Sequence, residues 1–197
     1  MLLSRTLSSR MPLRWWRTVK ITALKTYIVD SFRCNYVFLR METDEGIHGI
    51  AEATLERKEK TVEAAIHDLE NYLIGKDPRQ VELHFRNMYR DARWNRGPVL
   101  TTALSAVEIA MWDIKGKALG VPVYELLGGR VNDKVRMYAN AWFAGAKTPE
   151  EFAAKAKEAV ERGFTALKWD PFGTAYMEIS NRELQAASEQ VGAVRDE

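Results

Sequence analysis

The sequence has little cysteine, no long apolar run and no large excess of either charge. Its one cysteine, Cys34, has no partner in the chain, so a disulfide-stapled fold is excluded. No stretch approaches the roughly 18 apolar residues that a membrane-spanning helix needs, so we predict no membrane role. With 197 residues, 46% of them hydrophobic and 28% charged, disorder is excluded as well. We expect a cytoplasmic protein with one large domain or two small ones.

Acidic residues are absent from residues 1–18, which carry Arg5, Arg10, Arg14 and Arg17. Such a segment is typical of an organelle transit peptide or of an upstream mis-start, and we leave it out of the fold. Residues 19–197 carry 25 basic and 27 acidic residues, so the body lacks the basic face of a nucleic-acid-binding domain. We predict no nucleic-acid partner, although binding of a membrane or nucleic acid by the tail alone remains an alternative.

The first half of the chain has the pattern of a small α+β unit. Strands are expected over Lys20–Asp30, Asn35–Glu42 and Ile47–Ala51, the last two joined by the turn Thr43–Gly46. Two helices with apolar stripes from Val62 to Leu73 and from Val81 to Met88 follow. Pro98 then opens a longer helix that ends near Gly120 and Pro122.

After Gly128–Gly129 the pattern changes to alternating strands and helices. Strands are expected over Arg136–Trp142 and Phe164–Asp170. The residues Thr148–Glu151 supply an N-cap, a first-turn proline and a capping-box glutamate for one helix, and apolar residues from Leu184 to Val194 mark another. Two such units can neither close a barrel nor cover both faces of a sheet, so we expect the beginning of a parallel α/β domain that is cut short.

Several segments resemble one enzyme family. The segment Ala103–Gly128, ALSAVEIAMWDIKGKALGVPVYELLG, resembles the signature helix and exit loop of the mandelate racemase/muconate lactonizing enzyme branch of the enolase superfamily. The hairpin Glu42–Gly46 also fits this branch. The segments Thr61–Pro78 and Arg96–Pro98 are most similar to sugar-acid dehydratases of the galactonate and gluconate type.

The resemblance implies a fold and a division of the chain. We expect a tail or mis-start over 1–18, an enolase-like capping domain over 19–131, and the start of a truncated barrel domain over 132–197. The fold class is then an α+β cap, with a three-stranded antiparallel meander plus helices, followed by the first two β/α units of an incomplete TIM-type barrel.

The same resemblance implies an activity. It indicates the N-terminal part of a magnesium-dependent aldonate dehydratase, a lyase of carbohydrate acid catabolism. Such an enzyme removes an α-proton and eliminates water, acts on a small sugar acid, and is a homo-oligomer when complete. The Mg²⁺ ligands are expected beyond the C-terminus of this chain, no metal ligand is assigned within it, and the 197 residues alone are expected to be inactive. Two alternatives remain open: a racemase or cycloisomerase of the same superfamily, and a non-catalytic cap module.

Two residues at the end of the second barrel strand are the catalytic candidates. Alternation along Phe164–Asp170 places Lys168 and Asp170 on the face that points into a barrel, at the end where active sites lie. The family has Lys-x-Lys here, so Lys168 matches the first lysine and Asp170 replaces the second. We assign Lys168 to electrostatic stabilisation. Asp170 either orients Lys168 or accepts a substrate hydroxyl, and a structural ion pair between the two is the alternative.

Five further residues are candidates for substrate binding. On the first barrel strand, Tyr138 and Asn140 resemble the family's inward-facing substrate contacts, with simple packing as the alternative. Two cap loops, Ser31–Tyr36 and Glu52–Lys60, occupy positions that select substrate in this family. From the second loop we select the cations Arg57 and Lys58, and from the Arg-Gly-Pro segment Arg96. Solvated surface charge is the alternative for these three.

Overall fold

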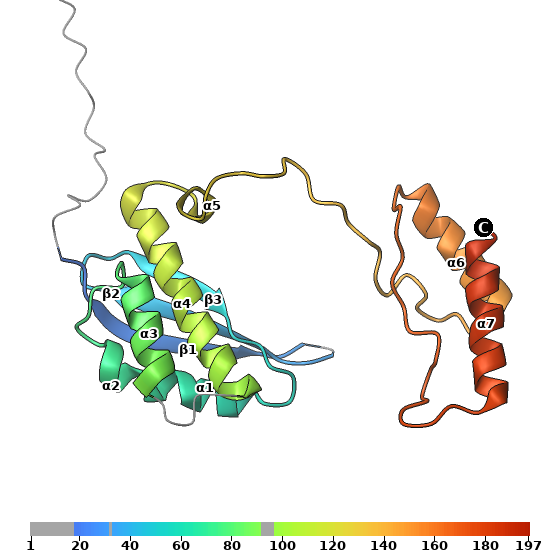
Figure 1. The fold of residues 1–197 in the computed structure, drawn as a ribbon, viewed down its shortest axis with the longest axis horizontal. Coiled ribbons are helices and arrows are strands. Elements are labelled where there is room, and N and C mark those ends of the chain that lie inside the picture. Colours follow the sequence, from blue (N-terminus) through green and yellow to red (C-terminus); the bar gives the residue numbers. More distant parts are fainter. Residues whose placement is uncertain (1–17, 32, 92–96) are drawn as a thin grey trace, which may run out of the picture. The chain divides into compact units, whose positions relative to one another are not determined.

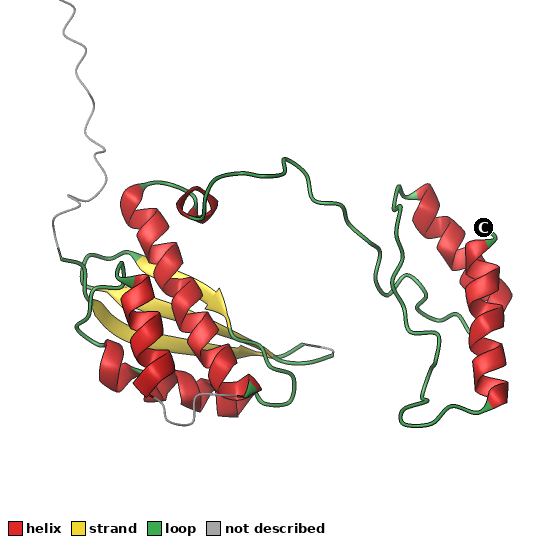
Figure 2. Cartoon of the chain, in the orientation of Figure 1, coloured by secondary structure: helices red, strands yellow, loops and turns green. Residues whose placement is uncertain are grey.

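The computed structural model describes residues 18–31, 33–91 and 97–197 (Figure 1). The chain divides after Arg130 into two compact units, Met1–Arg130 and Val131–Glu197. Within the described residues, the first unit holds the β-sheet and helices α1 to α5, and the second holds α6 and α7 (Figure 2).

The sheet of the first unit is a three-stranded antiparallel meander. Strands β1 (Ile21–Val29), β2 (Tyr36–Thr43) and β3 (His48–Glu52) lie in the order β1-β2-β3. The turn between β2 and β3 ends at Gly46, whose φ of 76° suits glycine and few other residues. The predicted meander is therefore confirmed, with each strand boundary within one residue of the expected one.

Helices cover one face of this sheet (Figure 1). They are α1 (Glu59–Asp68), α2 (Glu70–Leu73), α3 (Val81–Asp91) and α4 (Pro98–Leu119), and the short α5 (Val123–Leu126) contacts the end of α4. Helix α4 packs on β2 and β3, and α1 and α3 pack against α4.

Two helical details differ from the sequence expectation. The apolar stripe from Val62 to Leu73 is divided between α1 and α2, because Leu69 is at once the C-cap of the first and the N-cap of the second. The one-turn helix α5 follows Pro122 directly, and its four residues are too few to show a periodic pattern.

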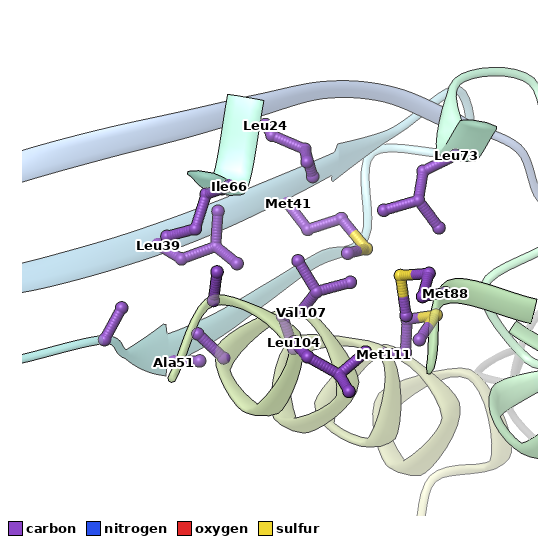
Figure 3. Close-up of a cluster of buried hydrophobic side chains, with 14 of the residues drawn as sticks. Leu24, Leu39, Met41, Ala51, Ile66, Leu73, Met88, Leu104, Val107 and Met111 are labelled. Carbon is purple, nitrogen blue, oxygen red and sulfur yellow. The ribbon is translucent and has the colours of Figure 1, made fainter. Parts of the chain in front are cut away.

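The core lies between α4 and the sheet. Leu39 and Met41 on β2 and Val107 and Met111 on α4 have no solvent exposure, and their side chains face one another (Figure 3). The two α4 residues are four positions apart and therefore lie on one side of the helix. Each fully buried side chain of this size contributes about 1.5–3 kcal/mol, and the same core includes buried residues of α1, α2 and α3.

A polar network joins α2, α3 and the segment between them. His84 is 2% exposed; its Nε2 lies 2.8 Å from the carbonyl oxygen of Asp77 and its Nδ1 lies 2.9 Å from the hydroxyl of Tyr72. The Asp77 carboxylate accepts hydrogen bonds from Arg79, at 2.9 Å from Nε and 2.6 Å from Nη2. Partial burial would by itself raise the pKa of Asp77, but the hydrogen bonds and charge of Arg79 hold that pKa below its ordinary value.

Replacing Asp77 with Asn therefore has a pH-dependent cost. Because the folded pKa of Asp77 lies below its unfolded value, the carboxylate stabilises the fold above the unfolded pKa, and this contribution is lost as pH falls through the folded pKa. We expect Asp77→Asn to lower the unfolding free energy by about 1–2 kcal/mol near neutral pH and by much less near pH 2. Urea titrations at both pH values measure the difference. The control is Glu82→Gln, which removes an exposed pair with Arg86 and is expected to cost under about 0.5 kcal/mol.

The second unit contains two helices that pack against each other, α6 (Pro149–Glu161) and α7 (Asn181–Arg195). Both begin with a complete capping box, formed by Thr148 with Glu151 and by Ser180 with Glu183. The box predicted from Thr148–Glu151 is therefore present. Four backbone N–H groups at each helix start lack partners within the helix, and the box satisfies part of that need.

The two expected strands of this unit are much shorter than predicted. The segments run parallel but share one bridge, Ala139 with Leu167, held by hydrogen bonds from Ala139 N to Ala166 O and from Lys168 N to Ala139 O, both 2.9 Å. Within the described residues, each segment pairs with no strand other than its partner. An isolated pair of strands is marginally stable. The first segment also turns away early, because Ala141 has a φ of 54°.

Candidate functional site

Lys168 and Tyr138 lie side by side at the ends of the two parallel segments. The ammonium Nζ of Lys168 is 5.8 Å from the centroid of the Tyr138 ring, within the range of a cation–π contact. The bridge at Ala139 sets this register, because the Lys168 N–H bonds the carbonyl of the residue that follows Tyr138. The structure thus brings together two residues that the sequence analysis selected from different strands.

Asn140 and Asp170 use their side chains on the local backbone. The Asn140 Oδ1 accepts a hydrogen bond from the Ala141 N–H at 3.0 Å, and the Asp170 Oδ1 accepts one from the Phe172 N–H at 3.0 Å. Each side chain stabilises the turn that follows its own segment. Among the described residues, no ion pair joins Lys168 to Asp170, so the structural pair considered as an alternative does not form here.

Four candidates lie at the ends of the two segments, and all are exposed: Tyr138, Asn140, Lys168 and Asp170. Tyr138 has 51% of its surface accessible. The cost of burying an inward-facing lysine and aspartate therefore does not arise in this chain. What the arrangement offers is an accessible cation held near an aromatic ring, with an amide and a carboxylate at neighbouring positions. Groups of this kind bind carboxylates and hydroxyls.

An aromatic cluster next to these residues was missed by the sequence analysis. Regular alternation along the expected strand Arg136–Trp142 would put Trp142 on the face of Tyr138 and Asn140, but the left-handed Ala141 ends that alternation. The Trp142 ring instead meets the Trp169 ring edge to face, with 5.2 Å between centroids, and its Nε1 donates to the carbonyl of Lys168 at 3.1 Å. The two tryptophans were a visible signal, but alternation along the predicted first strand assigned Trp142 to the same face as Tyr138 and Asn140.

A second group of candidates lines a hollow of about 220 Å³ in the first unit. Both predicted cap loops contribute to it, one through Asn35 and the other through the cations Arg57, Lys58 and Lys60. The remaining lining residues are Ile28, Glu59 and Thr61. The hollow is therefore cationic at the start of helix α1, and it suits an anionic or polyhydroxylated group.

The backbone of the second cap loop is fixed at Arg57. This residue has a φ of 63°, in the left-handed region that non-glycine residues seldom occupy, and its N–H bonds Glu59 Oε1 at 3.0 Å. An exposed ion pair between Arg33 and Glu56, at 3.4 Å, joins the two loops. Arg96, the fifth substrate-binding candidate, lies outside the described residues.

The described residues do not provide a magnesium site. Nowhere in the described parts of the chain do three histidine, cysteine, aspartate or glutamate side chains come together as potential metal ligands. No helix in residues 18–31, 33–91 and 97–197 combines the length and apolarity needed to span a membrane.

The sequence match that decides the family covers most of the first unit. The model of the mandelate racemase / muconate lactonizing enzyme N-terminal domain matches residues 17–128. The chain belongs to this family. Its relatives include the D-galactonate dehydratase of Pectobacterium atrosepticum, 40% identical over 90% of this chain, and the D-gluconate dehydratase of Thermoproteus tenax, 42% identical over 81%. The chain spans 45% and 32% of those two proteins, less than half of either.

Solved structures of the enolase superfamily share the fold. A member from Salmonella Typhimurium superposes with a TM-score of 0.83 at 31% identity, covering 90% of this chain and 52% of that one. An enolase from Pantoea ananatis with bound D-gluconate and Mg superposes with a TM-score of 0.68 at 34% identity, covering 76% and 36%. The chain therefore corresponds to the N-terminal part of these family members, with the antiparallel sheet and helices of their cap.

Proposed function

We propose that this chain is the N-terminal part of a magnesium-dependent aldonate dehydratase, a hydro-lyase that acts on a sugar acid such as galactonate or gluconate. The observation that carries the proposal is the identity of about 40% with a D-galactonate dehydratase over 90% of the chain, a stretch that includes residues of both units. The assignment of 19–131 as the cap and 132–197 as the start of the barrel belongs to this proposal, as do a cytoplasmic location and assembly into a homo-oligomer.

The reaction removes the proton next to the substrate carboxylate and expels the hydroxyl on the next carbon. The carboxylate gains negative charge as the proton leaves, and a positive group placed beside it stabilises the transition state. Lys168 is the group that this chain offers. The Tyr138 ring lies beside the Lys168 ammonium. In this proposal Tyr138 and Asn140 contact the substrate, and Asp170 either accepts a substrate hydroxyl or orients Lys168.

Magnesium would supply Lewis-acid chemistry in the complete enzyme, by polarising the substrate carboxylate. In this proposal the metal ligands lie beyond the C-terminus of this chain. The general base and the general acid are placed there too. We therefore expect the 197 residues alone to leave sugar acids unchanged.

The cations of the cap-loop hollow are further candidates for substrate recognition in this proposal. Arg57 and Lys58 would meet the hydroxylated end of the substrate, and Arg96 is assigned to the same task. Such contacts act on the bound ground state and the transition state alike, so they change KM more than kcat.

The test joins residues 1–197 to the part of the Pectobacterium D-galactonate dehydratase that follows the match; this product is called the extended chain. With D-galactonate or D-gluconate and Mg²⁺, we expect it to release the 2-keto-3-deoxy acid, while residues 1–197 alone release none. An extended chain that folds but only exchanges or inverts the α-proton, detected by proton NMR in D₂O, would favour a racemase or cycloisomerase. A folded extended chain with neither activity would favour a non-catalytic cap module.

Removing both loop cations should weaken substrate binding. In the extended chain, we expect Arg57→Ala combined with Lys58→Ala to raise KM about tenfold and to leave kcat within about twofold, since each exposed charged contact contributes about 0.2–1 kcal/mol. Steady-state kinetics with both aldonates measures the two constants. Arg86→Ala, which removes an exposed cation from α3, is the control and should change neither. Equal KM values for the double variant and the control would contradict the assignment.

A further inference from the structure

The main-chain carbonyl of Lys168 is held by a side chain that the proposed function does not use. The indole Nε1 of Trp142 donates a hydrogen bond to that carbonyl at 3.1 Å. On the other side of the same residue, the Lys168 N–H bonds the carbonyl of Ala139 at 2.9 Å. Both polar groups of the Lys168 backbone are therefore tied to the first parallel segment and to the turn after it.

Trp142 is itself fixed by aromatic neighbours. Its ring meets Trp169 and Phe152 edge to face, with centroid distances of 5.2 and 6.2 Å and interplanar angles of 82° in both cases. Phe152 is 8% exposed and belongs to α6, and the Nε1 of Trp169 donates to Gln190 of α7 at 3.3 Å. The indole thus contacts α6 directly and is linked to α7 only through Trp169.

The turn before Trp142 directs the indole back toward Lys168. Ala141 has a φ of 54°, a conformation that residues with a side chain disfavour, and the Asn140 side chain satisfies its N–H. Without this reversal, Trp142 would continue the alternation of the first segment. Backbone conformations of this kind persist where the surrounding structure holds them in place.

We propose that Trp142 is a positioning residue for Lys168. Its indole N–H fixes the Lys168 carbonyl, and with it the direction in which the lysine side chain leaves the strand end, over the Tyr138 ring. The inference rests on the proposed function for the role of Lys168. A tryptophan that only packs would stabilise the unit without deciding where the ammonium lies.

The test uses the whole 197-residue chain, isotope-labelled for NMR. The readouts are the nuclear Overhauser cross-peak between the Lys168 ε-protons and the Tyr138 ring, and the carbonyl carbon shift of Lys168. Trp142→Phe removes the donor and keeps an aromatic ring. A second variant carries 3-benzothienylalanine at position 142, which keeps the size of the indole and lacks only the N–H. The control, Phe143→Leu, alters a ring 5.7 Å from Trp142 that makes no hydrogen bond to Lys168.

We expect the cross-peak in the unsubstituted chain and in the control, and its loss in both variants at position 142, together with an upfield move of the Lys168 carbonyl. Persistence of the cross-peak in the benzothienyl variant would overturn the inference, as would its equal loss in Phe143→Leu or its absence from the unsubstituted chain. None of these readouts involves turnover. An extended chain without dehydratase activity would therefore refute the proposed function and leave this result in place.

Discussion

Replacing Lys168 with Met in the extended chain should lower kcat for aldonate dehydration by a factor of about 10² to 10³. That is the usual loss when one group that stabilises developing negative charge is removed. Met keeps most of the length of the lysine side chain and removes only the charge. Because Lys168 is exposed in this chain, its replacement should change the unfolding free energy by less than about 0.5 kcal/mol.

The control for this substitution is Lys157→Met. Lys157 is an exposed lysine of the same unit, on α6, whose nearest carboxylate is that of Glu197 at 3.8 Å. We expect it to leave kcat within about twofold, since a pair at that distance on the surface has little energy. Similar kinetics for the two variants would mean that the charge at position 168 has no special role.

Replacing Gly49 with Ala should unfold or severely weaken the first unit. Gly49 lies on β3 where α4 crosses the sheet, and a methyl group there would fall on the carbonyl oxygen of Ala110 and 2.8 Å from its carbon. Both of these atoms belong to the backbone, so no rotamer change relieves the overlap. Strand β3 cannot move away from α4 because Gly49 pairs with Met41 of β2. We expect a loss of about 3 kcal/mol or more, at the upper end of overpacking effects. Urea unfolding of the 197-residue chain measures it.

The matched control is the same substitution where space is available. Gly192 lies in α7, and a methyl group built on it meets nothing within 4 Å. Gly192→Ala should stabilise its helix by about 0.5–1 kcal/mol, because alanine loses less backbone freedom on folding. Equal unfolding midpoints for Gly49→Ala and the unsubstituted chain would show that β3 and α4 do not approach as closely as described.

The meander and the long helix of the first unit were predictable because local signals agreed. Gly46 closes a polar turn between β-rich runs, and Pro98 and Gly120 bracket the apolar stripe of α4. The need for Gly49 was not predictable, because it arises from a contact with Ala110, 61 positions along the chain. Nothing in the neighbourhood of a strand glycine reveals whether another backbone passes close to it.

The candidate site was predictable only where side chains alternate regularly between the two faces of a strand. This alternation placed Lys168 and Tyr138 on corresponding faces of two segments, and the two residues are neighbours in the structure. The same rule misplaced Trp142, because one left-handed residue, Ala141, ends the strand and no residue type there signals it. The roles of all seven candidates depend on a substrate, so they stay predictions: Lys168, Asp170, Tyr138, Asn140, Arg57, Lys58 and Arg96.

The most direct test of the account is a crystal structure of the extended chain with Mg²⁺ and bound D-galactonate or D-gluconate. The decisive measurement is the distance from Lys168 Nζ to the nearest oxygen of the substrate carboxylate. We predict a hydrogen-bond distance of about 3 Å. A lysine that points outward among α6, α7 and their neighbours, with the substrate bound elsewhere, would contradict the account.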